Sequence, residues 1–506
     1  MASLDYAHRR LVNALGPERV ARGELERMVY SHDFASLPKA ALLQWQLYPD
    51  FVVLPQTTEE VAAVVRLSDE TGLPITPRGS GTGTAGGSVP NRGGVLVDLR
   101  KMNRVLAFDA DDRKVTVEAG ATWEAVAAHL ATRGFVLPVE PVSAPSSTIG
   151  GGISNGAVGF GAYRRGSLRD MVLDLEVVLP DGRVVHTASP GEAGRAFADL
   201  TPLFFGAEGT LGIVTKATLR VDPKPEEARA AAYAFPDDAS ATSFVVGIVD
   251  AGVAVHHATF LDRDHFVFER ALTADTPDPA PIVLASLRGP KDEVLEQEKT
   301  LDGLAGPRKG TKLAADVAAR QWARRFTVYG ARRLSRGLVV SANLVPTGRL
   351  GEAVAEARGL IERLRLNGAV QASLLSPTTA SLAPYVLMDE TVPSGGTALG
   401  FVKKMGDAAI EMGGHPMGLG LLLVFNLERM HGRAARSLGA VKEVFDPGRK
   451  INGGKTVELW TKFTVPILNS VPPSVMGFGL ELAAFLRRIK PTKDRFVAAY
   501  ERERGA

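Results

Sequence analysis

One stretch of the chain, Thr148 to Gly166, is too rich in glycine to fill a hydrophobic core. It reads TIGGGISNGAVGFGAYRRG and has glycine at seven of its nineteen positions. Because glycine allows positive φ angles and a close approach to the backbone, such a turn can offer bare N–H groups to an anion such as a phosphate. Flexible linkers are also glycine-rich, but they are polar, whereas this stretch has Ile149, Val158 and Phe160 between its glycines. The stretch therefore predicts a ligand-binding turn.

The length and composition indicate a globular protein of several domains. A chain of 506 residues is too long for one core, and one domain per ~150 residues gives about two to four domains. Hydrophobic residues make up 45% of the chain and charged residues 23%, which argues against disorder. The net charge of +3 is small for this length and gives no basis for nucleic-acid binding.

Some chemistry and some locations are excluded by simple features of the sequence. There is no cysteine, so this chain has no disulfide, no thiolate-bound zinc, no cysteine-linked cofactor and no iron–sulfur cluster of its own. The N-terminus MASLDYAHRR has no apolar segment typical of a signal peptide. Apolar runs such as Leu419 to Phe425 are far shorter than the ~20 residues of a membrane-spanning helix. We expect a soluble, cytoplasmic protein.

Helix and strand signals alternate through the first half of the chain. Residues 4–30 predict a helical lead. Thr57 and Glu60 have the spacing of a capping box, and Gly72 is placed to end the helix that follows. Pro180, Asp181 and Gly182 predict the turn of a hairpin between strands 171–179 and 184–187. The other elements expected here are strands 73–76, 95–99, 114–118, 135–137 and 213–221 and a helix over 122–132.

A second glycine-rich loop, PRGSGTGTAGG from Pro77 to Gly87, contains the pattern G-x-G-x-x-G at Gly81, Gly83 and Gly86. In a Rossmann fold this pattern opens a helix whose N-terminus holds a pyrophosphate. Here it leads to the strand 95–99 instead. The loop can still bind a phosphate through its N–H and hydroxyl groups, with Arg78 adding charge, but as a nest and not as a helix end.

Three glycine turns now follow one another in a recognisable order. The segments PRGSGTGTAGG, PSSTIGGGISNGAVGFGAYRRGSLRDMVLDLEVVLPDGRVV and GAEGTLGIVTKATLRVDPKP resemble the flavin-contacting segments of FAD-linked oxidoreductases of the vanillyl-alcohol-oxidase type. In particular they are similar to the glycolate oxidase and D-lactate dehydrogenase branch. The resemblance covers residues 48–225 densely. It implies an α+β protein with a two-part FAD-binding domain of the PCMH type and an α+β cap domain whose antiparallel sheet covers the flavin and holds the substrate.

The resemblance also implies which residues bind FAD. The first loop would wrap the pyrophosphate with Pro77, Arg78, Gly79, Ser80, Gly81, Thr82, Gly83 and Thr84. The second segment would line the pyrophosphate and the flavin with Pro141, Ser147, Thr148, Gly151, Gly152, Asn155, Gly156, Gly159, Tyr163 and Gly166. The third would close the adenine and ribose side with Glu208, Gly209, Thr210, Gly212, Ile213 and Val214. Some relatives attach FAD through a histidine in the first loop or a cysteine in the second. Neither loop has one here, so FAD is expected to bind non-covalently.

The rest of the chain divides into a cap, a return segment and a tail. Strands and helices alternate through 226–420, with strands expected at 230–235, 255–261, 282–287, 338–345 and 369–375 and helices at 240–251, 291–304 and 349–364. Residues 421–456 contain VKEVFDPGRKINGGK, which is similar to the segment with which relatives return to the flavin domain, and Asn452 and Lys455 match its Asn and Lys. Residues 1–47 are the helical lead and 48–225 the FAD-binding domain. Residues 457–506 are a tail that the family pattern does not explain.

Arg325 is the candidate catalytic residue. It stands in QWARR with Trp322, which resembles the W-x-x-R stretch where relatives place an arginine against the substrate carboxylate. A guanidinium suits this task because its planar fork can bind both carboxylate oxygens. Several other arginines crowd the stretch, so a solvated basic helix face remains an equal alternative.

The sequence gives no metal site. His256 and His257 are neighbours on an expected strand and point to opposite faces, so they cannot bind one ion together, and we expect one in the core and one at the surface. Relatives carry a metal-binding Glu-His pair and a His-rich G-D-G-N segment. The matching positions here are Leu419 and Gly420, after His415, and the stretch from Gln371 to Tyr385, which has neither histidine nor acid. We expect turnover without a bound metal.

The tail has apolar residues followed by a basic cluster from Arg487 to Arg495. This pattern is typical of contact with an anionic membrane surface or with a partner subunit. A C-terminal helix packed on its own domain is an equal alternative.

Taken together, the residues predict an FAD-dependent dehydrogenase of a small organic acid such as a 2-hydroxy acid. It would pass electrons to a separate acceptor: oxygen, a quinone, an electron-transfer flavoprotein or an iron–sulfur subunit. A non-catalytic or electron-relay FAD subunit of a larger complex is one alternative, favoured by the missing metal site. An oxidase of a neutral alcohol or phenol is the other, favoured if the cap pocket is apolar and Arg325 points to solvent.

Overall fold

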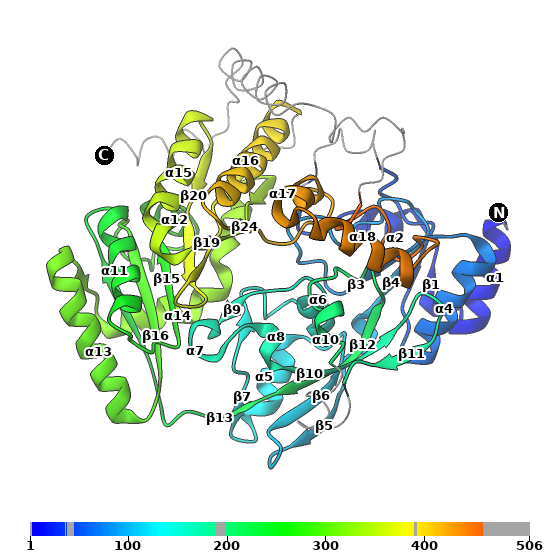
Figure 1. Cartoon of the computed structure of the whole chain (residues 1–506), viewed down its shortest axis with the longest axis horizontal. Helices are drawn as coiled ribbons and strands as arrows, with labels where there is room; N and C mark the ends of the chain where they lie inside the picture. Colours follow the sequence, from blue (N-terminus) through cyan, green and yellow to red (C-terminus); the bar gives the residue numbers. More distant parts are fainter. Residues whose placement is uncertain (1–2, 36, 38–44, 189–198, 389–391, 459–506) are drawn as a thin grey trace. The chain divides into compact units, whose positions relative to one another are not determined.

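The computed structural model describes residues 3–35, 37, 45–188, 199–388 and 392–458. These residues form two compact units (Figure 1). The first unit comprises the described residues within Met1–Gly159, Ser167–Lys224 and Gly418–Pro466, and the second those within Phe160–Gly166 and Pro225–Met417. Both units combine helices with sheets that are mainly antiparallel, which confirms the predicted α+β class. The predicted tail lies outside the described residues from position 459 on.

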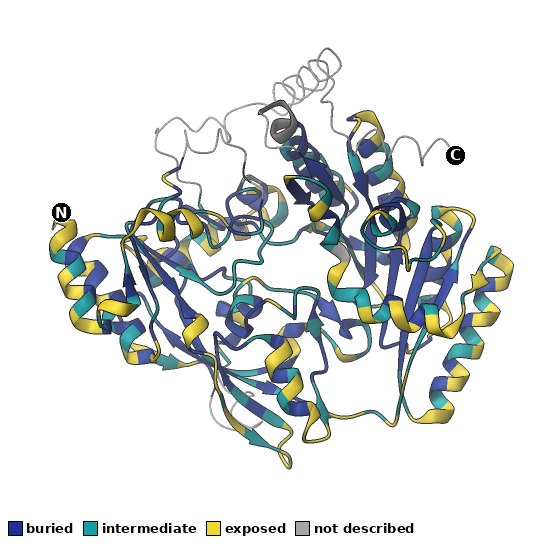
Figure 2. Ribbon diagram, turned by 180° about the vertical axis from the view of Figure 1, so that it is seen from behind, coloured by how far each residue is buried: buried dark blue, intermediate teal, exposed yellow. Residues whose placement is uncertain are grey.

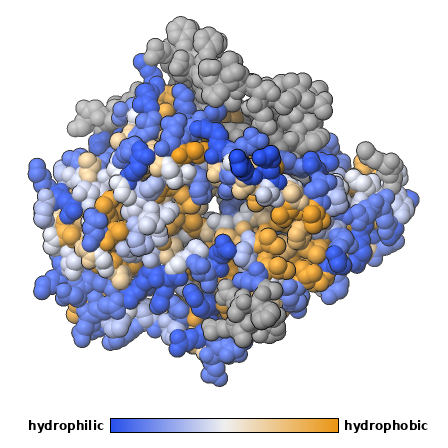
Figure 3. Space-filling model, in the orientation of Figure 1, coloured by the Kyte–Doolittle hydropathy of each residue, from blue (hydrophilic) through white to orange (hydrophobic). Residues whose placement is uncertain are grey.

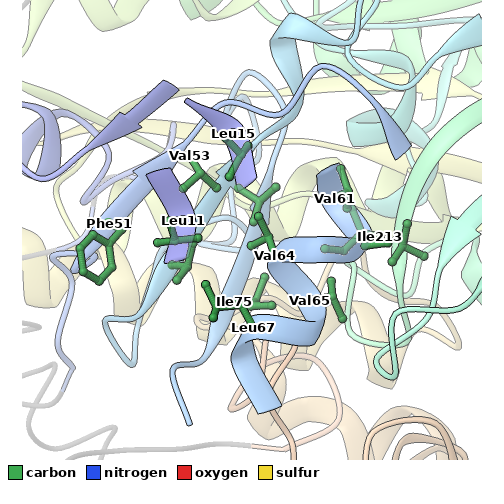
Figure 4. Packing of buried hydrophobic residues seen from close by; sticks show 14 of the residues in the cluster. Leu11, Leu15, Phe51, Val53, Val61, Val64, Val65, Leu67, Ile75 and Ile213 are labelled. Atoms are coloured by element: carbon green, nitrogen blue, oxygen red, sulfur yellow. The ribbon is translucent and has the colours of Figure 1, made fainter. Parts of the chain in front are cut away.

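A four-stranded sheet packed against two helices forms one core of the first unit. Its strand order is β1-β2-β4-β3, and both β2 and β3 run parallel to β4. The strands are β1 (Val20–Ala21), β2 (Phe51–Val53), β3 (Ile75–Arg78) and β4 (Val95–Asp98). Helices α1 (Leu4–Leu15) and α4 (Thr58–Thr71) bury Leu11, Val61 and Val65 in the same cluster as Phe51 and Ile75 (Figure 4).

The ends of α4 are fixed by the residues that the sequence indicated. Thr57 Oγ1 accepts a hydrogen bond from Glu60 N at 3.2 Å, and Gly72 ends the helix with φ 72°. The predicted helix is confirmed. The predicted helical lead is present but interrupted, because Gly16 adopts φ 91° and Pro17 starts a 3₁₀ turn (η1, Pro17–Arg19) that leads into β1 before α2 (Glu24–Val29).

An antiparallel five-stranded sheet of order β11-β10-β12-β6-β5 forms the other part of the first unit. Its strands are β5 (Val105–Asp109), β6 (Lys114–Glu118), β10 (Val172–Val178), β11 (Val184–His186) and β12 (Ile213–Arg220). The predicted hairpin is confirmed: Leu179 N donates to Arg183 O at 2.8 Å, and Gly182 turns the chain with φ 79°.

Short elements connect these sheets. They are η2 (Leu99–Lys101), α5 (Trp123–Ala131), β7 (Phe135–Val136), β8 (Glu140–Pro141), α6 (Ile149–Ser154), β9 (Gly159–Phe160), α8 (Leu168–Met171), α10 (Thr201–Phe204), β13 (Asp222–Pro223), η6 (Val424–Asn426), α17 (Leu427–His431) and α18 (Ala434–Phe445).

The second unit is built on an eight-stranded sheet of order β17-β14-β16-β15-β21-β22-β19-β24, in which the paired strands run antiparallel. Its strands are β14 (Glu227–Ala234), β15 (His257–Leu261), β16 (Ile282–Gly289), β17 (Thr311–Lys312), β19 (Asn343–Pro346), β21 (Gln371–Leu374), β22 (Thr379–Leu382) and β24 (His415–Pro416). A smaller antiparallel sheet has the order β18-β23-β20, from β18 (Gly337–Val340), β20 (Asn367–Ala369) and β23 (Tyr385–Met388).

Helices cover both faces of the large sheet. On one face Tyr233 contacts Phe244 of α11 (Asp238–Asp250) and donates to Asp302 of α13 (Lys291–Ala305). On the other face Leu261 and Leu284 pack with Trp322 of α14 (Ala315–Ala323). The remaining elements of this unit are α7 (Ala162–Arg165), α12 (Arg263–Leu272), η3 (Gly306–Arg308), η4 (Arg324–Leu334), η5 (Thr347–Arg349), α15 (Leu350–Arg363) and α16 (Val392–Glu411).

The predicted strand 338–345 was wrong, because this segment belongs to two sheets. β18 pairs with β23 in the small sheet, whereas β19 pairs with β22 in the large one. The chain changes sheets at Ser341, whose N–H donates to Pro384 O at 2.9 Å and whose carbonyl accepts from Asn343 Nδ2 at 2.8 Å. A run of apolar residues does not reveal such a change of partner.

Burial and surface character follow the sheets and helices. The strands are largely buried, whereas α1 and α13 each turn an exposed side outward (Figure 2). Hydrophilic residues occupy much of the outer rim of the face in Figure 3, and hydrophobic residues form smaller patches. No helix among the described residues is both long enough and apolar enough to cross a membrane.

The packing of α1 gives a first prediction. Leu11 is fully buried in the first core, whereas Leu4 on the same helix is 41% exposed. Leu11→Ala is expected to lower the free energy of unfolding of the first unit by about 2–5 kcal/mol, because it leaves a cavity. Urea denaturation measures this change, with Leu4→Ala as the matched control. Equal effects of the two substitutions would mean that α1 does not belong to this core.

Candidate functional site

The three glycine turns of the first unit lie against one another. A Cβ atom at Gly79 in the first loop would collide with Thr148 Oγ1 at the start of the second segment. A Cβ at Gly156 would lie 3.1 Å from Cα of Gly206 in the third turn, and Gly206 N donates to Ile153 O at 3.0 Å. Both positions favour glycine, because at Gly79 the Thr148 side chain leaves no room for a Cβ atom and at Gly156 the backbone of the third turn lies close. The turns therefore form one continuous surface.

The first loop leaves its backbone donors available. The N–H groups of Ser80–Thr84 donate no hydrogen bond to another described residue, and neither do the hydroxyls of Ser80, Thr82 and Thr84. The carbonyls of Gly81 and Gly83 accept from Phe34 N at 2.8 Å and Ala35 N at 3.2 Å, which holds the loop in place. As predicted, the loop has no helix and connects β3 to the parallel strand β4.

Positive charge and free space lie beside these donors. The guanidinium carbon of Arg78 lies 5.5 Å from the ring centre of Tyr30, and Arg78 Nη1 donates to His32 O at 2.7 Å. A Cβ at Gly83 would meet only Asp33 Oδ2 at 3.9 Å and Asn155 Oδ1 at 4.0 Å. A chain of donors next to a cation and an open space suits a phosphate group.

The second segment is not the open turn that the sequence predicted. Residues 149–154 form the helix α6, and Thr148 caps it by accepting from Gly151 N at 3.2 Å. Its other early N–H groups are also used, since Ile149 N donates to Ala121 O and Gly150 N to Ala119 O, both at 2.8 Å. This helix start therefore has no bare N–H groups for an anion.

The glycines of α6 serve packing more than backbone conformation. Gly151 and Gly152 do not have positive φ angles, contrary to the expectation for a glycine turn. A Cβ at Gly152 would lie 2.9 Å from Trp123 Nε1, so this glycine makes room for the indole. A Cβ at Gly151 would meet only Thr148 Oγ1, at 2.9 Å. Ser147 Oγ is buried and has no partner among the described residues.

The third turn and the return segment fasten the site together. The Glu208 carboxylate is buried and accepts from the N–H groups of Leu419 and Gly420 at 2.8 and 2.9 Å and from Thr456 Oγ1 at 2.9 Å. Asn452 Nδ2 donates to Glu208 O at 2.7 Å and Gly87 O at 2.9 Å. The return segment thus ties the third turn to the first loop. Leu419 and Gly420, which stand where relatives have the metal-binding Glu-His pair, take part in these hydrogen bonds through their backbone N–H groups.

Lys455 and Asp33 are buried charges next to the first loop. Lys455 Nζ donates to Asn452 Oδ1 at 2.6 Å and to Gly87 O at 3.0 Å. Burial lowers the pKa of Lys455 to about 7, against the attraction of Asp33 and Glu208. Burial raises the pKa of Asp33 to about 6 although Ala35 N donates to it. Asp33 was missed in the sequence because no motif surrounds it.

The other predicted cofactor residues have varied surroundings. Ile213 and Val214 are buried, and Ile213 packs in the first core. Thr210 Oγ1 donates to Ala207 O at 2.7 Å, and a Cβ at Gly209 would lie 2.8 Å from Pro77 Cγ. Pro141 O accepts from Ala144 N at 2.9 Å. Tyr163 and Gly166 belong to the second unit, at α7.

A pocket of about 270 Å³ lies within the second unit, on the face of the large sheet covered by α14. Its floor is the sheet, where Thr259 pairs with Leu284 and Leu261 with Gln371. Its walls come from α12, α14 and η4, with Phe160 beside them. The lining residues are Phe160, Thr259, Leu261, His265, Phe268, Glu269, Leu272, Thr273, Leu284, Gln321, Trp322, Arg324, Arg325, Thr327, Gly330, Ala331, Arg333, Gln371 and Tyr385.

Arg325 lies in the wall of this pocket. Its guanidinium carbon is 4.1 Å from the ring centre of Phe326, 4.7 Å from that of Trp322 and 5.7 Å from that of Phe160. Arg325 Nη1 also donates to Trp322 O at 3.0 Å, which the three-residue spacing of W-x-x-R allows. Aromatic faces on several sides fix a cation without neutralising it. The neighbour Arg320 fits the solvated-face interpretation, since it is exposed and paired with Asp316.

Neutral polar groups accompany this cation. His265 Nδ1 and Tyr385 OH are 2.9 Å apart. Burial lowers the pKa of His265 to about 4 and raises that of Tyr385, so both are uncharged at neutral pH. Gln371 Oε1 is buried without a partner among the described residues. Gln371 and Tyr385 bound the stretch that the resemblance matched to the relatives' His-rich segment, but the sequence marked neither as a site residue, and His265 on α12 belongs to no motif.

The histidines differ in part from the prediction. His256 and His257 are both buried, at 4% and 1% exposure, so neither is a surface residue. His257 Nε2 lies 2.9 Å from Thr259 Oγ1, and burial, with the charges of Arg325 and Arg288, lowers the pKa of His257 to about 3. His415 is exposed. Within the described ranges no three His, Asp or Glu side chains are grouped closely enough to hold a metal ion.

Comparison with known protein families gives two matches along the chain. Residues 49–188 match the FAD binding domain family, and residues 224–456 match the C-terminal domain of FAD linked oxidases. The probable mitochondrial D-lactate dehydrogenase of Danio rerio is 32% identical over 81% of this chain and 85% of its own length. The glycolate oxidase subunit GlcD of Bacillus subtilis is 28% identical over 88% of this chain and 95% of its own length.

A solved structure shares the fold. p-Cresol methylhydroxylase with bound substrate superimposes with a TM-score of 0.78, over 90% of this chain and 97% of the other, at 19% sequence identity. At this identity the likeness concerns the fold alone. The PCMH-type architecture inferred from the three glycine segments is confirmed.

Gly83 allows a test of the first loop that does not disturb packing. Gly83→Val is expected to weaken FAD binding at least about tenfold, because the added side chain would enter the space beside the free N–H groups while meeting no protein atom closer than 3.9 Å at Cβ. Bound flavin measured by absorbance, with the thermal unfolding of the apoprotein, checks this. Gly303→Val on α13, where a Cβ meets nothing within 4 Å, is the control. Normal flavin content in Gly83→Val would exclude this loop as the cofactor site.

Proposed function

The chain belongs to the family of FAD-linked oxidases that includes D-lactate dehydrogenases and glycolate oxidase, and on this premise we propose that it is a dehydrogenase of a small 2-hydroxy acid. Bound FAD supplies the acceptor for a hydride from the substrate carbon. The observation that carries the proposal is the position of Arg325, a fixed cation in the wall of a pocket of the second unit.

We assign the cofactor site to the turns of the first unit. The N–H groups of Ser80–Thr84 and the charge of Arg78 would hold the pyrophosphate, and Ser147 Oγ, buried without a partner, would donate to the cofactor. Thr148, Glu208, Asn452 and Lys455 would keep the turns in place. Attachment would be non-covalent, because neither of the first two turns has a histidine or cysteine to link to a flavin.

Arg325 would bind the substrate carboxylate. A charge-assisted hydrogen bond contributes roughly 1.5–3 kcal/mol, more than a neutral one, and a guanidinium can make two to one carboxylate. Contact with Trp322 and Phe326 restricts the side chain before the substrate arrives, so less conformational entropy is lost on binding. His265 and Tyr385 would offer the substrate hydroxyl neutral hydrogen-bonding groups.

The two alternatives predict different pockets. A neutral alcohol or phenol would suit the apolar part of the lining, but it could not make the charge-assisted hydrogen bonds that Arg325 offers to a carboxylate. A non-catalytic FAD subunit would need no such pocket. The pocket with its fixed cation therefore favours oxidation of an acid.

We propose that electrons leave through a separate acceptor. This chain has no cysteine and so cannot bind an iron–sulfur cluster through thiolates. An electron-transfer flavoprotein, a quinone or an iron–sulfur subunit would serve. A location in the cytoplasm, with peripheral membrane contact through the segment after residue 457, remains part of this proposal; that segment lies outside the described residues from 459 on.

Replacement of Arg325 tests the substrate assignment. Arg325→Met is expected to raise KM for the acid about a hundredfold at unchanged flavin content, because one charge-assisted pair is worth roughly 2–3 kcal/mol. Steady-state kinetics with an artificial electron acceptor measures KM. Arg320→Met, which removes an exposed arginine of α14, is the control. If both variants bind the acid like the unaltered protein, Arg325 does not recognise the carboxylate.

Turnover is expected to continue after exhaustive chelation. The polarisation of a 2-hydroxy acid by a metal needs several nitrogen and oxygen ligands that converge on one point, and Leu419 and Gly420 instead use their backbone N–H groups to bind Glu208. Flavin reduction should be unchanged, with elemental analysis of the same sample. A stoichiometric metal whose removal stops flavin reduction would contradict this expectation.

A further inference from the structure

We propose, on the basis of the function proposed above, that the substrate is a 2-hydroxy acid with a bulky apolar side chain of aromatic size, and not glycolate or lactate. The inference rests on the volume, the lining and the charges of the pocket in the second unit.

The pocket is larger than the smallest 2-hydroxy acids need. One water molecule needs roughly 10–15 Å³ of cavity volume, whereas this pocket has about 270 Å³. Glycolate has no side chain and lactate only a methyl group, so either would leave much of this space to water. Water gains little there, because most of the lining offers it no hydrogen bond. An apolar side chain of the substrate would displace that water favourably.

The apolar lining is continuous along one helix and the sheet opposite it. His265, Phe268 and Leu272 are spaced by three and four residues on α12, so they share one face of the helix. Seven residues of α-helix span roughly 10 Å, at ~1.5 Å per residue. Leu261 and Leu284 lie on the same face of the sheet below. A side chain the size of a phenyl ring can lie between these two surfaces.

The charges of the pocket favour one carboxylate and not two. Glu269 is paired with Arg324, at 3.2 Å between Oε1 and Nη1, so their charges largely cancel. Arg333 is exposed, where its charge is solvated and contributes little. A second carboxylate on the substrate would meet Glu269, whose Oε2 is buried without a partner among the described residues. Arg325, held against the rings of Trp322 and Phe326, is the cation that we assign to the single carboxylate.

Gln371 offers a hydrogen-bond acceptor to a hydroxyl group of the substrate. It is 5% exposed, lies on the pocket floor, and its Oε1 has no partner among the described residues. A buried acceptor without a donor is costly, and a ligand hydroxyl would satisfy it. The pocket thus combines a cation, a hydrogen-bond acceptor and a long apolar wall, which are the groups that a bulky 2-hydroxy acid would contact.

The test compares acids that differ only in the side chain. The FAD-loaded protein is assayed with an artificial electron acceptor on both enantiomers of lactate, 2-hydroxyisocaproate, 3-phenyllactate and 2-hydroxyglutarate, and on glycolate. The value of kcat/KM is expected to rise at least about tenfold from lactate to 3-phenyllactate, as burial of a large apolar side chain predicts. A preference for glycolate, lactate or 2-hydroxyglutarate would overturn the inference and leave the proposed function intact. Reduction by none of these acids would overturn both.

A substitution that fills the pocket identifies the residues responsible. Leu272→Trp is expected to lower kcat/KM for 3-phenyllactate about tenfold more than for lactate, because it occupies the far end of the apolar wall. Leu295→Trp on α13, which is 42% exposed and lies outside the pocket, is the matched control and should change neither value. Flavin content and thermal unfolding of both variants show whether they fold. An equal loss for both acids in a folded Leu272→Trp protein would contradict selection by this wall.

Discussion

A buried carboxylate holds the cofactor site of the first unit together. Glu208 is almost fully buried, and its carboxylate is stabilised by hydrogen bonds from the N–H groups of Leu419 and Gly420 and from the Thr456 hydroxyl of the return segment. An ionised carboxylate placed there without such donors would be costly. The return segment must therefore close over the third turn for this carboxylate to be accommodated. Segments as far apart in the sequence as Glu208 and Thr456 are needed to complete one site.

The buried charges next to the first loop, those of Asp33, Glu208 and Lys455, influence one another. The charges of Asp33 and Glu208 both attract the Lys455 ammonium group. Asn452 links this group to the third turn, because its Nδ2 donates to Glu208 O and its Oδ1 accepts from Lys455 Nζ. Burial shifts the pKa of Lys455 down and that of Asp33 up, toward each other, so both groups are close to losing their charge near neutral pH. A phosphate bound at residues 80–84 would add negative charge beside this group and would favour the protonated form of Lys455.

The sequence predicted the elements that local chemistry determines and failed where distant residues decide. Helix α4 and the hairpin at Gly182 were predicted because caps and turn residues lie inside the segment itself. The helix α6 was not, because glycine is a poor helix former and tertiary contacts override it: Trp123 fills the space above Gly152, and the carbonyls of Ala119 and Ala121 take its first N–H groups. The division of strand 338–345 between two sheets likewise depends on its partners.

In the candidate site, too, the sequence predicted the residues that lie in a local pattern and missed those that only the fold brings in. The first loop and Arg325 were found because a spacing of glycines or a W-x-x-R pattern marks them. Asp33, His265, Gln371 and Tyr385 have no such pattern, and only the fold brings them to the loop or the pocket. In this pocket burial keeps His265 uncharged, while aromatic rings hold a charged arginine. A buried imidazole gives up its proton readily, whereas a guanidinium keeps it at any pH the protein survives. The positive charge of the pocket is thus placed on the one kind of side chain that burial cannot neutralise.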